Sequence, residues 1–216
     1  MLESILHHID RLYGLDLGVD IRDFVVDGDT CARLGADPSR GSVLVKQDGD
    51  GAVAIGLYIG DENLERLTSV DLSLALSPSS LEVLFLAIEE VSHFAYLLFS
   101  AARAKRVTEL ELELQAEVDK FVTSATLLAS RNGGRVPQNL LDRLFSDFEP
   151  RPELGEEERT RYRAASSLAS RYCAHVVRAA LTRERRLTPL LPELRSFYRL
   201  GQGGKIGRIH HVVYSA

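Results

Sequence analysis

Three ionisable side chains at helical spacing, Glu89, Glu90 and His93, form the clearest chemical signal in the chain. Glu89 and His93 are four positions apart, so on a helix they share one face and can bind a single metal ion. Glu90 falls in the apolar stripe of the same helix, beside Leu86 and Phe94. A buried carboxylate needs a metal ion, a cation or hydrogen bonds, because an isolated ionised group is costly to bury. The pattern predicts a metal site or a buried polar cluster.

A second acidic pair, Glu113 and Glu117, begins twenty residues beyond His93. The segment Glu89–Glu90–Val91–Ser92–His93 resembles the HExxH zinc helix of the gluzincin metalloproteases, with glutamate in place of the first histidine. In that family a downstream helix supplies a glutamate ligand, and the segment from Glu113 to Glu117 resembles the ExxxD pattern of that helix. The resemblance spans roughly residues 42–125 and predicts a zincin-like protein.

The resemblance implies a role for each of these residues. His93 and Glu113 would bind zinc, with Glu89 where the family has a histidine ligand. Glu90 would be the general base that acts on the attacking water, and Glu117 would support a ligand from behind. The activity implied is that of a metal-dependent peptidase or other hydrolase, or of a relative that has lost catalysis. Because two glutamates make the site more anionic, manganese or iron could take the place of zinc.

Two other interpretations of the same residues stay open. In the first, they form a hydrogen-bonded network between two packed helices, closed by Lys120 or by an arginine of the C-terminal segment. The protein would then be a non-enzymatic interaction or scaffold protein. In the second, Glu90–Val91–Ser92–His93 is the ExxH motif of a ferritin-like di-iron bundle, with Glu113 or Glu117 from a neighbouring helix. The chain contains no second ExxH, which counts against this interpretation.

Two long helices must carry these side chains. Ser79 and Glu82 match a capping box, which predicts a helix from near residue 81 to about residue 105. A second helix is predicted over residues 108–131, ahead of an Asn-Gly-Gly stop at residues 132–134. Glutamate and leucine alternate over residues 109–114 as they would in a strand. Both are strong helix formers, however, and the apolar spacing continues with a helical period.

The residues before the site predict a small sheet. A helix is expected over residues 2–13, ended by Gly14, and a short strand over residues 23–26. The clearest hairpin signal joins residues 42–46 to residues 52–59 through a Gly- and Asp-rich turn. A short helix is expected over residues 62–68. We therefore predict a helix-rich α+β fold with a small N-terminal sheet, two long central antiparallel helices and a C-terminal helical segment.

The C-terminal part is predicted to pack on this core. Residues 1–148 form the zincin-like α+β core, and residues 149–216 form a basic helical segment. A short helix is expected within residues 137–148 and a long one over residues 156–186. Residues 201–205, rich in glycine, predict a flexible turn, followed by a short strand or tail at residues 210–214.

Charge divides the chain unevenly. Residues 1–155 carry 14 basic and 26 acidic side chains, whereas residues 156–216 carry 12 and 5, so the parts are −12 and +7. The arginines at positions 159, 163, 171 and 178, with Tyr162 and Tyr172 beside them, could bind a phosphate backbone. Packing on the acidic part of the chain, self-association or a protein partner is the favoured use of this charge over nucleic acid.

Composition and cysteine spacing exclude several classes. With 45% hydrophobic and 26% charged residues, the chain is typical of a soluble globular protein. The N-terminus lacks the pattern of a signal peptide, and four ionisable residues interrupt the apolar run of residues 81–102, so no membrane span is expected. Cys31 and Cys173 lie far apart without a CxxC motif, which argues against a disulfide framework or a thiolate zinc site. A cytoplasmic location fits best.

Overall fold

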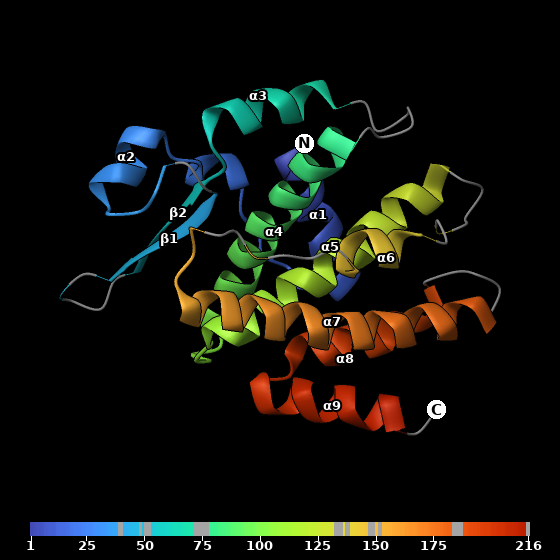
Figure 1. Cartoon of the computed structure of the whole chain (residues 1–216). Coiled ribbons are helices and arrows are strands. Elements are labelled where there is room, and N and C mark those ends of the chain that lie inside the picture. Colours follow the sequence, from blue (N-terminus) through green and yellow to red (C-terminus); the bar gives the residue numbers. More distant parts are fainter. Residues whose placement is uncertain are drawn as a thin grey trace.

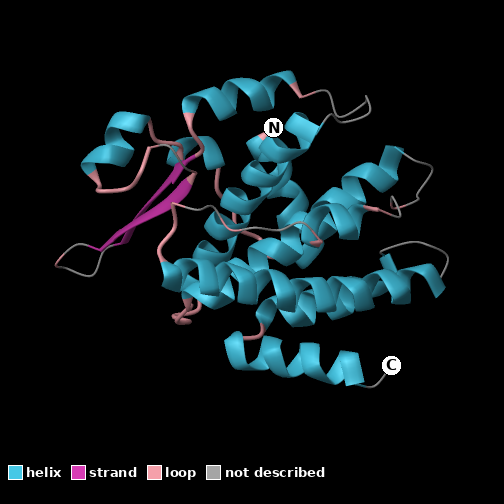
Figure 2. Ribbon diagram, in the orientation of Figure 1, coloured by secondary structure: helices cyan, strands magenta, loops and turns pink. Residues whose placement is uncertain are grey.

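Most of the chain is helical, and one β-hairpin projects from its side (Figures 1 and 2). The computed structural model describes residues 1–38, 41–47, 49, 53–70, 78–131, 136, 139–146, 150, 153–182 and 188–214. The N-terminal elements are α1 (Leu2–Tyr13), the 3₁₀-helix η1 (Ile21–Phe24), α2 (Gly28–Arg33), β1 (Ser42–Gln47), β2 (Val53–Tyr58) and α3 (Asp61–Ser69). The later elements are α4 (Pro78–Ala101), α5 (Glu109–Arg131), α6 (Leu140–Phe145), α7 (Glu156–Thr182), the 3₁₀-helix η2 (Thr188–Leu190), α8 (Leu191–Arg199) and α9 (Gln202–Tyr214).

Helices α4 and α5 pack against each other in antiparallel directions. Their side chains meet in reverse order along the chain: Ser92 bonds Asp119, and Tyr96 bonds Glu111. Helix α1 covers one side of this pair, and α7 lies along α5 on another (Figure 1). The central pair is therefore enclosed, which explains why α5 buries several charged side chains that need partners inside the protein.

Aromatic stacking joins helix α8 to the rest of the core. The rings of Tyr13 and Tyr198 stack with centroids 4.1 Å apart, and those of Tyr172 and Phe197 with centroids 3.9 Å apart. All four side chains are buried. These contacts tie α1, α7 and α8 together through large apolar surfaces.

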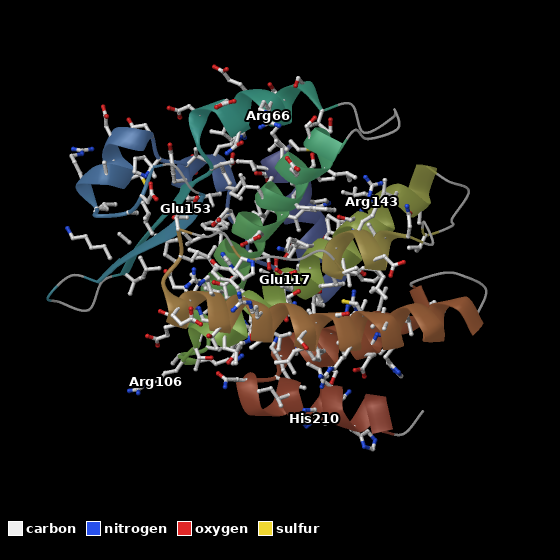
Figure 3. The ribbon with its side chains drawn as sticks, viewed as in Figure 1. Arg66, Arg106, Glu117, Arg143, Glu153 and His210 are labelled. Atoms are coloured by element: carbon white, nitrogen blue, oxygen red, sulfur yellow. The ribbon has the colours of Figure 1, made fainter. Side chains whose placement is uncertain are left out.

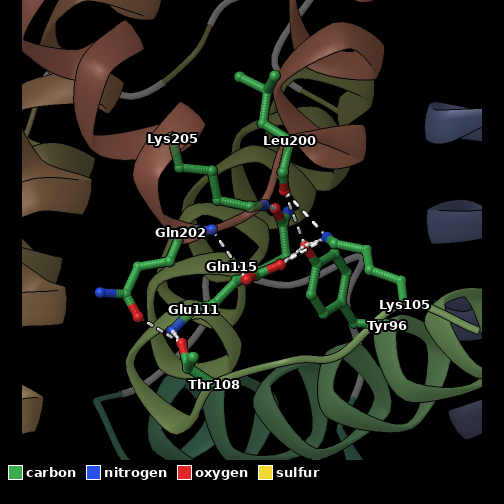
Figure 4. A network of polar contacts seen from close by, with 8 residues as sticks. All are labelled: Tyr96, Lys105, Thr108, Glu111, Gln115, Leu200, Gln202 and Lys205. Atoms are coloured by element: carbon green, nitrogen blue, oxygen red, sulfur yellow. Dashed lines mark hydrogen bonds and ion pairs between the residues drawn. The ribbon is translucent and has the colours of Figure 1, made fainter.

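A polar network fastens α9 to the central helices (Figure 4). The ammonium of Lys105 donates to one carboxylate oxygen of Glu111 (2.5 Å), and the backbone N–H of Gln202 donates to the other (2.9 Å). The fully buried Lys205 donates to the side-chain oxygen of Gln115. The first turn of α9 is thus held by Glu111 and Gln115 of α5, and Lys105, in the turn that follows α4, bonds Glu111.

The hairpin is a two-stranded antiparallel sheet, with Ser42 paired to Tyr58 and Gln47 to Val53. Its base contacts α4. The next segment, α3, returns along the side of α4 (Figure 1). The hairpin therefore lies beside the helix that carries the predicted site residues.

The structure confirms the predicted fold class and corrects several boundaries. Residues 23–26 are not a strand: they belong to η1 and to a single parallel bridge between Val25 and Leu57. The first long helix begins at Pro78 and ends at Ala101 instead of residue 105, because the chain turns there and Ala104 takes a φ of 51°. The predicted turn at residues 48–51 and the predicted helix ends at residues 132–134 and 183–186 lie wholly or partly outside the described residues.

The C-terminal prediction was wrong in a different way. Residues 201–205 and 210–214 were expected to form a flexible turn and a strand or tail, but Gln202–Tyr214 is the helix α9. Three glycines weaken its intrinsic helix propensity. Lys205 and Ile209 are nonetheless fully buried, so tertiary packing stabilises a helix that the local sequence disfavours. The proposed division after residue 148 stays a prediction.

Helix α4 also has the length and apolar composition of a membrane-spanning helix, over Ser79–Ala101. Of its most apolar window, 72% is buried inside the protein. A buried core helix passes the same test, so this property gives only weak support for a membrane span.

Candidate metal centre

Helices α4 and α5 bring together three potential metal ligands. One donor atom from each of Glu89, His93 and Glu113 lies within 4.8 Å of the other two. His93 and Glu113 are each 7% exposed, and the Glu89 side chain is 21% exposed. Zinc–oxygen and zinc–nitrogen bonds are about 2.0–2.2 Å long, so small side-chain movements would close this group around one ion.

The imidazole of His93 lies between two carboxylates. Its Nδ1 is 3.7 Å from Oε2 of Glu90, and its Nε2 is 3.5 Å from Oε2 of Glu113. Neither Nε2 of His93 nor Oε2 of Glu90 has a hydrogen-bond partner among the described residues. Buried polar atoms usually have partners, so two unpartnered atoms in one cluster point to a group that would bind them. An imidazole with carboxylates is a donor set that suits zinc, manganese or iron.

The base of the hairpin covers Glu90. A Cβ atom at Gly41 would lie 2.8 Å from both Cγ and Oε1 of Glu90, so the glycine backbone rests directly on this side chain. Glu90 is 4% exposed as a result. Burial raises the pKa of the Glu90 carboxyl above its ordinary value, and the charges of Glu89 and Glu113 raise it further, against the effect of His93.

Replacing Gly41 with alanine should therefore displace either Glu90 or the hairpin. We expect a loss of about 1–3 kcal/mol in the free energy of unfolding, because the added methyl group overpacks a filled site. Thermal and urea unfolding would measure this loss. A matched change, Gly207→Ala in α9, meets no atom within 4 Å and should not destabilise the protein. Equal stability of the two variants would show that Gly41 does not rest on Glu90 in solution.

Lys120 forms two ion pairs at the other end of the cluster. Its Nζ is 2.9 Å from Oε2 of Glu89 and 2.7 Å from Oε1 of Glu117. Burial alone would lower the pKa of Lys120, but the carboxylates of Glu117 and Glu89 outweigh burial and raise it. Glu117 lies in the interior, whereas residues such as Arg106 and His210 lie at the periphery (Figure 3). Of the two alternatives that the network interpretation left open, Lys120 and a C-terminal arginine, Lys120 forms the ion pairs with Glu89 and Glu117.

The cluster carries more carboxylates than cations. Four glutamates, at positions 89, 90, 113 and 117, face one lysine and one histidine. Burial opposes protonation of His93, but the carboxylates of Glu113 and Glu90 hold its pKa well above the ordinary value. The pKa of Glu117 is also raised, in this case by burial itself. Without a metal ion, protons on these groups reduce the excess negative charge, and a divalent ion would replace them.

Tyr162 of α7 adds a third helix to the centre. Burial raises the pKa of its phenol, and the charges of Glu113 and Glu89 raise it further. The phenol therefore stays protonated beside the cluster and can donate a hydrogen bond toward Glu113. Sequence reasoning considered Tyr162 only as a partner of nucleic acid, because no local pattern connects it to a glutamate 49 residues earlier.

The residues predicted for the site lie in one cluster but have different neighbours. Glu89, His93 and Glu113 form the three-residue group, and Glu90 lies beside His93. The carboxylate of Glu117 hydrogen-bonds Lys120. The nearby arginine of α7, Arg161, forms an ion pair with Glu109 at 2.5 Å, outside this cluster.

Comparisons of the chain with protein-family models, curated proteins and solved structures gave no match. Of the resemblance to the gluzincins, the structure bears out the cluster of two glutamates and one histidine.

Proposed function

We propose that this protein is a zincin-like metal-binding protein in which Glu89, His93 and Glu113 bind one divalent ion between α4 and α5. The observation that carries the proposal is the buried Nε2 of His93, which has no hydrogen-bond partner among the described residues and lies 3.5 Å from Oε2 of Glu113 in a cluster with excess negative charge. An ion there would give that nitrogen a partner and offset the carboxylates. Lys120 is compatible with this, because its ammonium donates to Oε2 of Glu89 and an ionised carboxylate can accept more than one partner.

We further propose that the ion supports hydrolysis, of peptides in the first instance. A bound zinc, manganese or iron ion would supply a Lewis acid that polarises a carbonyl oxygen. Glu90 lies against His93, and its raised pKa makes it a stronger base than an ordinary glutamate. The hairpin base at Gly41 would have to move aside to admit a substrate to Glu90.

A second candidate function is that of a non-enzymatic interaction or scaffold protein. The two ion pairs of Lys120, at 2.9 and 2.7 Å, favour it, because they give Glu89 and Glu117 partners without any metal. The same pairing weakens the ferritin-like di-iron interpretation, since it occupies one carboxylate oxygen of Glu117 that a second iron would need.

Elemental analysis of protein purified without a histidine tag or chelator tests the proposal. We expect near-stoichiometric zinc, manganese or iron in the wild type. The His93→Ala and Glu113→Ala double variant should lose the metal while thermal melting shows that it still folds. His7→Ala combined with Glu82→Ala changes an exposed histidine and an exposed glutamate, and this control should keep the metal.

Two results would decide between the candidate functions. A wild type that binds none of the three ions after incubation with each would overturn the metal proposal and favour the helix-packing network. If metal binds, peptide cleavage by the loaded protein tests the hydrolase part. A Glu90→Gln variant should then keep the ion and cleave about 100-fold more slowly or worse. A loaded protein that cleaves no peptide in a broad library would limit the function to metal binding.

A further inference from the structure

A groove between α6 and α7 has the features of an anion site. It has a volume of about 340 Å³ and is lined by Phe145 of α6 and by five residues of α7: Arg163, Ser166, Ser167, Ser170 and Arg171. The five α7 residues recur at intervals of three and four and so share one helix face. None of the lining residues belongs to the metal centre.

The two arginines of the groove have no hydrogen-bond or ion-pair partner in the part of the chain that the structure describes. Arg163 and Arg171 are exposed, and within the described residues neither makes a hydrogen bond or an ion pair. Other arginines on the same helix are engaged: Arg159 pairs with Glu156 at 2.7 Å and Arg161 with Glu109 at 2.5 Å. No carboxylate is among the described residues that line the groove. This described lining therefore carries two positive charges and no negative one.

The spacing of the donors suits a phosphate group. Arg163 and Arg171 are eight residues apart, which places their backbones about 12 Å apart along the helix. Their long side chains can reach inward from both ends toward one ligand. A guanidinium group presents a planar set of N–H donors that matches two phosphate oxygens at once. The three serine hydroxyls between them add further donors, and Ser166, at 5% exposed, forms part of the buried floor.

The groove also favours a small ligand over a polynucleotide. Phe145 is partly exposed and offers an apolar surface beside the polar floor. Tyr162 and Tyr172, which lie beside these arginines in the sequence, are not among the lining residues: Tyr162 lies beside Glu113, and Tyr172 is buried on Phe197. The volume is at the lower end of the range for small-molecule sites.

We propose that this groove binds a small phosphorylated organic molecule. Arg163 and Arg171 hold its phosphate group, and its apolar part packs on Phe145. This inference is independent of the proposed metal function, because it uses other residues and another ligand chemistry.

Calorimetric titration of the metal-depleted full chain with phenyl phosphate tests the proposal, since removal of metal prevents binding at the centre. We expect phenyl phosphate to bind at least about tenfold more tightly than inorganic phosphate, because only the former can contact Phe145. The Arg163→Gln and Arg171→Gln double variant should weaken binding by at least about tenfold, because it removes two charge-assisted contacts. Phe145→Ala should reduce the affinity for phenyl phosphate to that for inorganic phosphate.

The control variant combines Arg11→Gln with Arg106→Gln. It removes the same charge from exposed positions of other elements and should bind like the wild type. Equal loss in both double variants, or no binding of phenyl phosphate at millimolar concentration, would overturn the proposal. So would an RNA oligonucleotide that binds through Arg163 and Arg171 while phenyl phosphate does not. Thermal melting of each variant confirms that it is folded before titration.

Discussion

Replacing Lys120 with methionine is expected to lower the free energy of unfolding of the metal-free protein by about 3–5 kcal/mol. Lys120 is 8% exposed and holds two carboxylates, Glu89 and Glu117, so its loss leaves buried negative charges without their cation. Methionine keeps a similar length and an unbranched shape, which limits the packing loss. Urea unfolding with a chelator present would measure the difference.

The same variant should show a defined dependence on pH. Burial already raises the pKa of Glu117, and the loss of the nearby ammonium raises it further. A carboxyl whose folded-state pKa is raised stabilises the fold at low pH, and this contribution is lost as pH rises through the folded pKa. The loss in free energy of unfolding caused by Lys120→Met should therefore be larger at pH 8 than at pH 5.

Adding zinc or manganese to this variant separates the two candidate functions. If Glu89, His93 and Glu113 bind an ion, the ion replaces part of the lost positive charge, and the variant should gain more thermal stability from it than the wild type does. A large deficit that no ion reduces would favour the helix-packing network. Arg106→Met, at an exposed position after α4, should change stability by about 0.5 kcal/mol or less. A similarly small effect at Lys120 would contradict the ion pairs themselves.

The helices that carry the centre were predictable because the signals are local. The spacing of Glu89, Glu90 and His93 indicates one face of a helix whatever surrounds it. The helix of Glu113 follows from the strong propensity of glutamate and leucine. Their antiparallel packing follows from the short connection between two long helices.

The partners of these residues could not be predicted in the same way. Which carboxylate Lys120 pairs with depends on the register of α4 against α5, and that register is set by packing across the whole interface. Tyr162 and Gly41 reach the centre from segments far away in sequence. The helix α9 was not predicted, because the burial of Lys205 depends on packing against distant segments and leaves no local pattern in the sequence.

The buried network of Lys205, Gln115 and Asp119 predicts an unusual dependence of the free energy of unfolding on pH. Lys205 donates to the side-chain oxygen of Gln115, and the side-chain nitrogen of Gln115 donates to Asp119 (2.9 Å). Tyr13 and Ser92 also donate to the Asp119 carboxylate. Lys205 and Asp119 are both fully buried and are connected through one amide.

Burial moves the two pKa values toward each other. It lowers the pKa of Lys205 to about 7, although the charge of Asp119 opposes this. Burial raises the pKa of Asp119 to about 6, against the hydrogen bonds from Ser92, Tyr13 and Gln115. Both groups are charged in the folded protein only between about pH 6 and pH 7.

The sign of each contribution follows from linkage. Asp119 has a raised folded-state pKa, so its contribution to stability is present below its unfolded value and is lost as pH rises through about 6. Lys205 has a lowered folded-state pKa, so the folded state releases its proton first. The cost of burying the charged Lys205 lowers the stability of the protein below about pH 7. Stability recovers as pH rises from there toward 10.5, the pKa of an ordinary lysine. Together the two groups stabilise the protein least near pH 6–7.

A variant with Asp119→Asn and Lys205→Met removes both titrations and keeps most of the packing. The unfolding free energy of the wild type minus that of this variant should pass through a minimum near pH 6–7. Each side should rise by at most about 1.4 kcal/mol per pH unit, the limit for one proton. Urea unfolding between pH 5 and pH 9 would give this difference, in which the effects of all other titrating groups cancel.

The single variants assign the two sides of the minimum. Asp119→Asn should remove the acid side. It should also move the alkaline side to lower pH, because the charge of Asp119 helps to hold the proton on Lys205. Lys205→Met should remove the alkaline side and move the acid side to higher pH, because the charge of Lys205 lowers the pKa of Asp119. A difference that is flat across this range would show that neither group titrates there, and that the network anchors α9 through hydrogen bonds whose protonation does not change.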